Sequence, residues 1–249
     1  TEDSAEAETR QAAVQAILAA HTKPRDVLDL SNFTIRTKPP LFMFSADSTT
    51  VYFCDGLSDS FEGALDFKTA KYFHDLDRWA IDLCPADEIE NRAIAKSAIL
   101  DVIHKKLEAL DISGYQFTSL PPLSLLTSLK DLNLQGTKFT TLDSDSFSSL
   151  TALRYLNLSE NQISELPPRI FDPLTALRSL NLSDNQISEL PPGIFDQLTA
   201  LDALFLSENS IVTFPPNVFD SLREITALLL DSNLITHLPP DIFSLSLIH

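Results

Sequence analysis

Cysteine is scarce in this chain of 249 residues, which contains only Cys54 and Cys84. Small secreted domains that depend on disulfide bonds carry far more cysteine than this. The two thiols could pair with each other, but a sequence does not give the distance between them. We therefore favour buried, reduced thiols over a disulfide.

Long apolar runs and an excess of basic charge are also missing. No stretch of 18 apolar residues occurs, so the sequence predicts no membrane insertion. The acidic, alanine-rich start does not resemble a signal peptide, although a signal removed earlier stays an alternative. The formal net charge of −17 argues against nucleic acid and anionic membranes as partners, because phosphates attract basic patches. The same charge favours a basic protein partner.

The sequence contains no recognisable catalytic or metal-binding motif. There is no nucleophile elbow, phosphate-binding loop or zinc-ligand spacing, and the five histidines are scattered. The densest polar cluster, His74–Arg78, falls on a predicted helix and is expected to form its solvated face. The sequence therefore predicts no enzyme activity, no cofactor and no metal site in this chain.

The chain does contain a regular repeat. The pattern Leu-x-x-Leu-x-Leu-x-x-Asn-x-Ile begins at Leu153 and recurs at Leu177 and Leu201, each time 24 residues on. A further copy follows with its first leucine replaced, and two weaker copies precede, with Thr137 and Tyr115 at the asparagine position. Such a period predicts a solenoid in which each of six repeats adds one short strand to a parallel sheet.

Each position of the repeat forms a column with its own expected role. Side chains alternate between the faces of a strand, so two leucine columns point inward. These columns are Leu156, Leu180, Leu204, Leu228 and Leu158, Leu182, Leu206, Leu230. An asparagine column is expected to bond the turning backbone: Asn161, Asn185, Asn209, Asn233. A phenylalanine column is expected to form a spine along the convex wall: Phe147, Phe171, Phe195, Phe219, Phe243. Paired prolines predict irregular or extended backbone on that side.

A helix is predicted from about Asp87 to Leu107, directly before the first repeat. Asp87 is the expected N-cap with Glu90 at the third helical position, a variant of the capping box. Its apolar stripe is Ile99, Val102, Ile103 and Leu107. Because a terminal repeat exposes apolar core and a strand edge, we expect this helix to cover it.

The first part of the chain shows a second, weaker periodicity. A shift of 82 residues aligns 28–33 with 110–115 and predicts a duplicated helix near 5–20, with coincidence as the alternative. Between the two copies, Leu41–Phe44 and Thr50–Phe53 predict a hairpin. Residues 67–83 predict an amphipathic helix with Trp79 in the core. The predicted domains are 1–86, an α+β module; 87–106, a capping helix; and 107–249, six repeats.

The repeats can be compared with a known family. The segments LPPRIFDPLTAL at 166–177 and LPPGIFDQLTAL at 190–201 resemble the 24-residue type of leucine-rich repeat found in extracellular receptors and some bacterial proteins. The resemblance implies an α/β fold: a leucine-rich-repeat solenoid with a parallel β-sheet on its concave face, an N-terminal helical cap and a small α+β module.

The resemblance also implies a protein–protein interaction module. Paired-cysteine caps are missing, which favours a bacterial or host-interacting protein, such as a cytosolic or secreted effector, over a vertebrate receptor ectodomain. Cys54-Asp55 is similar to a pairing in bacterial ubiquitin ligases of this family. The alternative function is therefore substrate recognition for a ubiquitin-ligase-like or other enzyme whose catalytic domain is not in this chain.

The predicted binding surface consists of the concave strand positions and the rims beside them. Tyr155 and Phe205 are the expected anchors, because aromatic side chains dominate binding hot spots. The full predicted set is Lys130, Asp131, Asn133, Arg154, Tyr155, Asn157, Glu160, Arg178, Asn181, Asp184, Phe205, Glu208 and Leu229. In the alternative interpretation, Asn157 and Asn181 are structural and Phe205 packs on a neighbouring chain. Exposed Leu229 and Leu234 at the last repeat would allow self-association.

Overall fold

The computed structural model describes residues 41–44, 51–54, 75–76, 79–80, 87–238 and 242. The chain divides into two compact units, Thr1–Asp77 and Arg78–His249. The first unit contains an antiparallel hairpin of β1 (Leu41–Phe44) and β2 (Val51–Cys54), as the sequence predicted. The predicted duplicate helix and most of the predicted helix 67–83 lie outside the described residues. The domain boundary placed at residue 86 stays a prediction.

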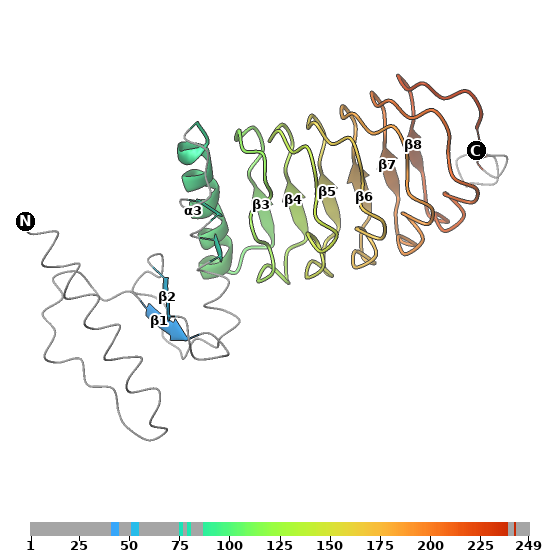
Figure 1. Cartoon of the computed structure of the whole chain (residues 1–249). Coiled ribbons are helices and arrows are strands. Elements are labelled where there is room, and N and C mark those ends of the chain that lie inside the picture. The colour runs from blue at the N-terminus through green and yellow to red at the C-terminus, as the bar shows by residue number, and fades with distance from the viewer. Residues whose placement is uncertain are drawn as a thin grey trace, which may run out of the picture. The chain divides into compact units, whose positions relative to one another are not determined.

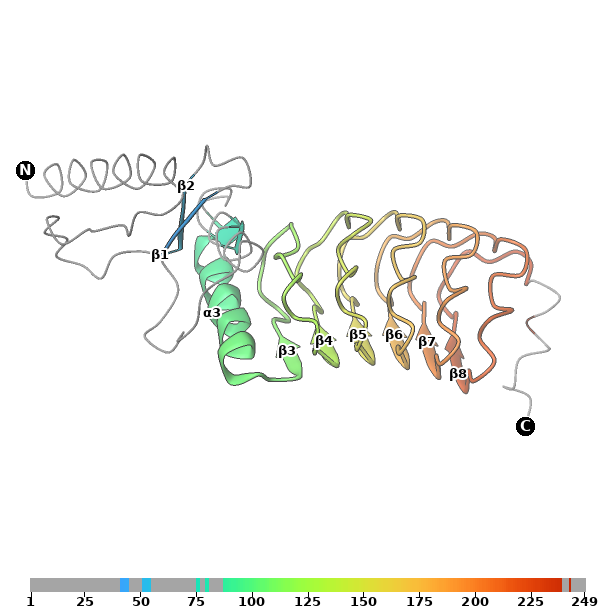
Figure 2. The ribbon, with the colours of Figure 1, turned by 90° about the horizontal axis from the view of Figure 1, so that it is seen from below.

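The second unit is a solenoid with one three-residue strand per repeat (Figures 1 and 2). Its strands are β3 (Ala109–Asp111), β4 (Asp131–Asn133), β5 (Tyr155–Asn157), β6 (Ser179–Asn181), β7 (Ala203–Phe205) and β8 (Ala227–Leu229). They form one parallel six-stranded sheet in chain order. Equivalent residues of successive repeats pair directly, so each column predicted from the sequence is a row across the sheet.

The core of the solenoid consists of the inward leucine and phenylalanine columns. The central leucines of β3 to β7 are buried, whereas Leu228 in β8 is only half-buried. Phe147, Phe171, Phe195 and Phe219 are fully buried and stack with centroid distances of 6.3, 6.5 and 6.4 Å. The predicted spine is confirmed for these four residues, and Phe243 lies outside the described part.

The asparagine column bonds the backbone of two adjacent repeats. In the second repeat with this residue, Asn185 Nδ2 donates to the carbonyl oxygens of Leu158 at 2.9 Å and Leu182 at 3.1 Å. Its Oδ1 accepts from the Ile163 amide at 3.0 Å. Asn161, Asn209 and Asn233 repeat this pattern. The predicted structural role of the column is confirmed.

Helix α3 (Ile89–Lys105) precedes the first strand and contacts it. The predicted capping box at Asp87 is wrong: Glu88 occupies the N-cap position and makes no side-chain cap hydrogen bond. Its carboxylate is instead 2.6 Å from the guanidinium of buried Arg92, and it accepts from the amide and hydroxyl of Thr118. A buried carboxylate needs a charged partner more than an exposed helix end needs a cap.

The face that α3 buries differs from the predicted stripe. Arg92, Ala95, Ile99 and Val102 are buried, while Leu107 is 45% exposed. Leu107 is exposed because the helix ends at Lys105. The C-cap residue Lys106 has a left-handed φ of 52°, so Leu107 no longer follows the helical period. The predicted covering face is therefore correct at Ile99 and Val102 and wrong at Leu107.

Trp79 contacts both helix α3 and the first repeat. Its indole Nε1 donates to the Ser119 carbonyl at 3.0 Å, and its ring lies edge-on to Phe117 at 5.2 Å between centroids. The Arg92 guanidinium carbon is 5.0 Å from the indole centroid, and Arg92 also donates to the Trp79 carbonyl at 2.8 Å. Trp79 is 7% exposed, which confirms its predicted place in the core.

Candidate functional site

Two rows of side chains cover the concave face of the sheet. They lie on either side of the buried central leucine of each strand, since neighbouring strand residues point to opposite faces. The row that begins each strand, here called the tyrosine row, is Ala109, Asp131, Tyr155, Ser179, Ala203 and Ala227. The row that ends each strand, here called the amide row, is Asp111, Asn133, Asn157, Asn181, Phe205 and Leu229. Both rows match the sequence-based register.

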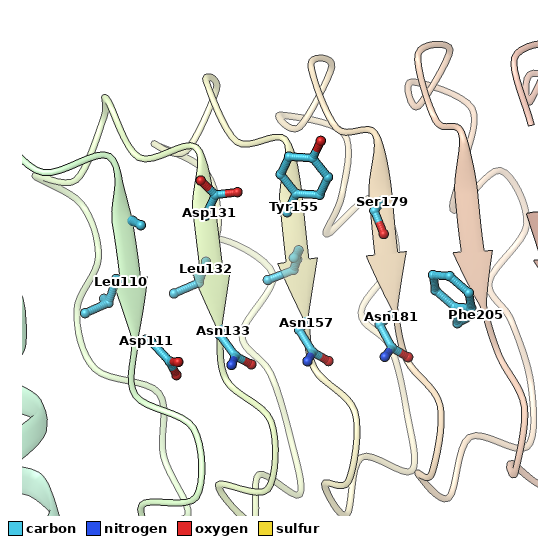
Figure 3. Close-up of a pocket in the computed structure, with 12 residues that line it drawn as sticks. Leu110, Asp111, Asp131, Leu132, Asn133, Tyr155, Asn157, Ser179, Asn181 and Phe205 are labelled. Atoms are coloured by element: carbon cyan, nitrogen blue, oxygen red, sulfur yellow. The ribbon is translucent and has the colours of Figure 1, made fainter.

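A groove of about 410 Å³ runs over these rows from β3 to β7 (Figure 3). Six members of the predicted binding set line it: Asp131, Asn133, Tyr155, Asn157, Asn181 and Phe205. Asp111 and Ser179 also line the groove but were absent from that set. The repeat itself contained the signal for them, because both occupy the same strand positions as residues that were included.

The other predicted residues lie beside the groove and do not line it. Lys130, Arg154 and Arg178 immediately precede their strands and form a basic rim. Glu160, Asp184 and Glu208 follow their strands by three residues and form an acidic rim beyond the carboxyl ends of β5, β6 and β7, opposite the basic rim. Leu229 lies in β8, beyond the groove. Lys130 Nζ is 2.6 Å from Glu108 Oε1, so its charge is already compensated.

The side-chain oxygens of the amide row hold the turns that follow the strands. Asn157 Oδ1 accepts from the Ser159 amide at 3.0 Å and its hydroxyl at 2.7 Å. Asn181 Oδ1 accepts from the Ser183 amide at 3.0 Å, and Asn133 and Asp111 make equivalent bonds. These bonds support the alternative interpretation for Asn157 and Asn181, because their side-chain oxygens stabilise the turns. The bonds also fix each side chain at the edge of the groove.

Asp111 carries a stabilised charge at the first strand of the groove. Partial burial raises the pKa of this carboxyl, but hydrogen bonds from the Ser113 backbone and hydroxyl and from the Asn133 side chain outweigh burial. The net result is a pKa below the ordinary 3.8. The carboxylate is therefore ionised at neutral pH, with its neighbours oriented to support the charge.

The two predicted anchors differ in exposure. Tyr155 is 50% exposed and projects from β5 over the middle of the groove. Phe205 is half-buried at the end of β7 beside Asn181, as Figure 3 shows. Both aromatic rings can therefore gain buried area when a partner covers the sheet, which is the property expected of anchors.

The acidic rim has an unusual backbone conformation. Glu160, Asp184 and Glu208 have φ values of 54°, 54° and 53°. The first two repeats place Gly114 and Gly136 there, with φ values of 74° and 66°. Glycine adopts this left-handed region freely, whereas a side chain costs about 1 kcal/mol. Three acidic side chains thus occupy positions that the fold alone would give to glycine. The glycines in the same column of the first two repeats were the sequence signal for this conformation.

The described residues contain neither a metal-binding cluster nor a membrane-spanning helix. No group of three or more histidine, cysteine, aspartate or glutamate side chains there could hold a metal ion. No helix in that part of the chain has the length and hydropathy needed to cross a bilayer. The described surface therefore offers polar, acidic and aromatic contacts without a metal cluster.

Comparison with known proteins places the repeats in a family. The family model "Leucine rich repeat" matches residues 127–187 and 176–235. The crystal structure of an internalin (inlF) from Listeria monocytogenes is similar, with 29% sequence identity and a TM-score of 0.51 over 63% of this chain. The match covers 43% of that internalin, so this chain spans less than half its length. A search of curated proteins gave no match. In sequence repeat, sheet and core, residues 127–235 are leucine-rich repeats of the 24-residue type.

Proposed function

We propose that this chain binds a protein partner through the concave groove of its solenoid. The observation that carries the proposal is the groove itself, which is lined by both concave rows from β3 to β7. The leucine-rich-repeat scaffold is a protein–protein interaction module and is typically not catalytic. The buried columns hold the fold, which leaves the concave rows available for recognition.

The dimensions of the sheet suit one ordinary protein interface. Six strands at about 4.8 Å spacing give a face roughly 25 Å across. Such a face can contribute about 800 Å² to an interface of standard size. Tyr155 and Phe205 supply the aromatic anchors, and the acidic rim favours a partner with basic groups facing it.

The biological setting is the finer part of the proposal. The proposed setting is a bacterial or host-interacting protein, and the structure to which the repeats are similar is an internalin from Listeria monocytogenes. The alternative is substrate recognition for a ubiquitin-ligase-like or other enzyme whose catalytic domain is not in this chain. It is motivated by the Cys54-Asp55 pair, which is similar to a pairing in bacterial ubiquitin ligases of the family. Labelling of Cys54 with a thiol-reactive activity probe would favour instead a catalytic group within residues 1–85.

The concave-face assignment is tested by affinity capture with point variants. Immobilised wild-type chain is compared with Tyr155→Ala/Phe205→Ala, and bound proteins are identified by mass spectrometry. Val212→Ala is the matched control, because Val212 is an exposed apolar residue outside the groove. We expect the double variant to lose the captured partner while its melting temperature stays near that of the wild type. Equal capture by both would refute the assignment.

The exposed leucines of the last repeat favour a second mode of association. Leu229 and Leu238 are exposed, and Leu234 is 62% exposed. These side chains would pack against a second copy of the chain or another apolar surface. Sedimentation velocity should show mass rising with concentration for the wild type and less so for Leu234→Lys. A strict monomer at all concentrations would exclude this mode.

A further inference from the structure

The groove is chemically different at its two ends. At the β3–β4 end it is lined by the carboxylates of Asp111 and Asp131, and neither forms an ion pair within the described residues. The nearest base in sequence, Lys130, is bonded to Glu108 instead. At the β6–β7 end, Ser179, Asn181 and Phe205 line the groove without any charged group. A ligand that fills the groove therefore meets negative charge at one end and an aromatic surface at the other.

Between these ends the amide row presents side chains suited to a peptide backbone. The oxygens of Asn157 and Asn181 are held by Ser159 and Ser183, which fixes the direction of the two amides. Asn157 Nδ2 makes a long hydrogen bond of 3.3 Å to Gln135, and Asn181 Nδ2 has no acceptor among the described residues. Amide nitrogens donate to carbonyl oxygens, which a peptide backbone presents whatever its sequence.

The length of the groove determines how many residues of an extended peptide it can hold. Four strand intervals separate β3 from β7, which at about 4.8 Å each gives roughly 19 Å. An extended peptide advances about 3.3 Å per residue, so about six residues cover this distance. Because alternate side chains share a face, residues i and i+6 of such a segment point into the groove together.

We propose, building on the concave-face function above, that the groove binds an extended segment of the protein partner, laid across the strands and polarised in composition. A lysine or arginine of the segment lies between Asp111 and Asp131, and an apolar or aromatic residue about six positions away packs on Phe205. The amide row contacts the backbone between them. Charge complementarity supports this occupant, since an acidic segment would be repelled by the two carboxylates.

The proposal is tested with synthetic peptides of seven residues. The probe has lysine first, phenylalanine last and five serine or threonine residues between, and its reversed sequence covers the opposite direction of binding. Matched peptides replace the lysine with glutamate, replace the phenylalanine with alanine, or shorten the spacer by two. Binding to the full chain is measured by fluorescence anisotropy. We expect the better of the two directions to bind at least about tenfold more tightly than each matched peptide.

Variants of the chain assign the two ends of the peptide. Asp111→Asn/Asp131→Asn should abolish the preference for lysine over glutamate and leave the preference for phenylalanine over alanine. Phe205→Ala should do the reverse. Glu189→Gln removes an exposed carboxylate outside the groove and is the matched control. Melting temperatures establish that each variant is folded.

The outcomes separate this inference from the proposed function. Absence of peptide binding in both directions, or equal affinities for the lysine and glutamate peptides, would overturn the polarised segment. If capture of the partner still required Tyr155 and Phe205, concave-face binding would stand with a folded surface as its occupant. If capture were also unchanged in that double variant, both proposals would fail.

Discussion

At the scale of single residues, asparagine has two different tasks in each repeat. Asn185 is buried and bonds the Leu158 and Leu182 carbonyls and the Ile163 amide, whereas Asn181 holds only the Ser183 amide at the groove. Asn185→Ala would leave these buried backbone groups unsatisfied, at a cost of about 2–4 kcal/mol. Asn181→Ala should cost less than about 1 kcal/mol. Urea unfolding of the two variants measures both, and equal losses would contradict the division of roles.

The left-handed acidic residues predict a trade-off between stability and binding. Glu208 has a φ of 53°, and glycine stands at the equivalent position in the first two repeats. Glu208→Gly should raise the free energy of unfolding by up to about 1 kcal/mol, because glycine adopts this φ without strain. The greater conformational entropy of glycine in the unfolded chain offsets part of this gain. The same change should weaken the binding of a basic partner, because it removes a carboxylate from the acidic rim. Gly136→Ala is the converse control and should destabilise, whereas a stability gain from it would argue against backbone strain.

The lowered pKa of Asp111 gives a prediction about pH. A carboxyl with a depressed folded-state pKa stabilises the protein above its unfolded value and loses that contribution as pH falls through the folded pKa. For Asp111 this window lies below about 3.8, because hydrogen bonds from Ser113 and Asn133 outweigh burial. Carbon-detected NMR titration should show Asp111 titrating below the ordinary aspartate pKa of 3.8. Ser113→Ala removes the hydroxyl bond and should move the Asp111 pKa upward, and no movement would mean that this bond does not lower it.

The residues of the sheet and its rows could be predicted because the same residue types recur at the same positions in every repeat. Leu156, Asn185 and Phe195 each occupy a column whose spacing alone gives their role. The extent of the groove could not be predicted, because it depends on how the stacked strands curve. The left-handed backbone at Glu208 does not follow from its local sequence and is indicated only by the glycines in the same column of the first two repeats.

At the scale of elements, the extent of the capping helix α3 was easier to predict from the sequence than its interactions. Helix α3 was predicted nearly to its ends, because its composition and position before the first repeat are local properties. Its N-terminal interactions were missed because Glu88 and Arg92 are positioned by Thr118 and Trp79. These contacts join segments far apart in the chain, and the cap occurs once in the solenoid, so no periodicity repeats them.

The buried ion pair of the cap predicts a large asymmetry between variants. Arg92→Leu leaves Glu88 buried without its charged partner and should cost about 3–5 kcal/mol. Adding Glu88→Gln should recover part of this loss, because the uncompensated charge is removed. Lys105→Ala breaks the exposed pair with Asp101 and should cost less than about 0.5 kcal/mol. Urea unfolding checks the series, and a double variant no more stable than Arg92→Leu would contradict it.

At the scale of the whole solenoid, each repeat is stabilised mainly by its neighbours, so unequal ends should give unequal local stability. The first strand is contacted by α3. At the other end, Leu228 and Leu230 are only half-buried, whereas their equivalents in β5 to β7 are buried. Opening should therefore start at β8 and spread toward the middle of the sheet.

Hydrogen exchange at three equivalent amides tests this gradient. The amides of Asp131, Tyr155 and Ala227 each donate to a carbonyl of the preceding repeat, at 3.0, 3.0 and 3.1 Å, so their hydrogen bonds are matched. We expect Ala227 to exchange at least about tenfold faster than Tyr155, equivalent to about 1.4 kcal/mol less local stability. In Arg92→Leu, Asp131 should lose protection while Ala227 does not change, because the weakened cap adjoins only the first repeats. Equal exchange at all three sites in the wild type would show that the repeats unfold as one cooperative unit.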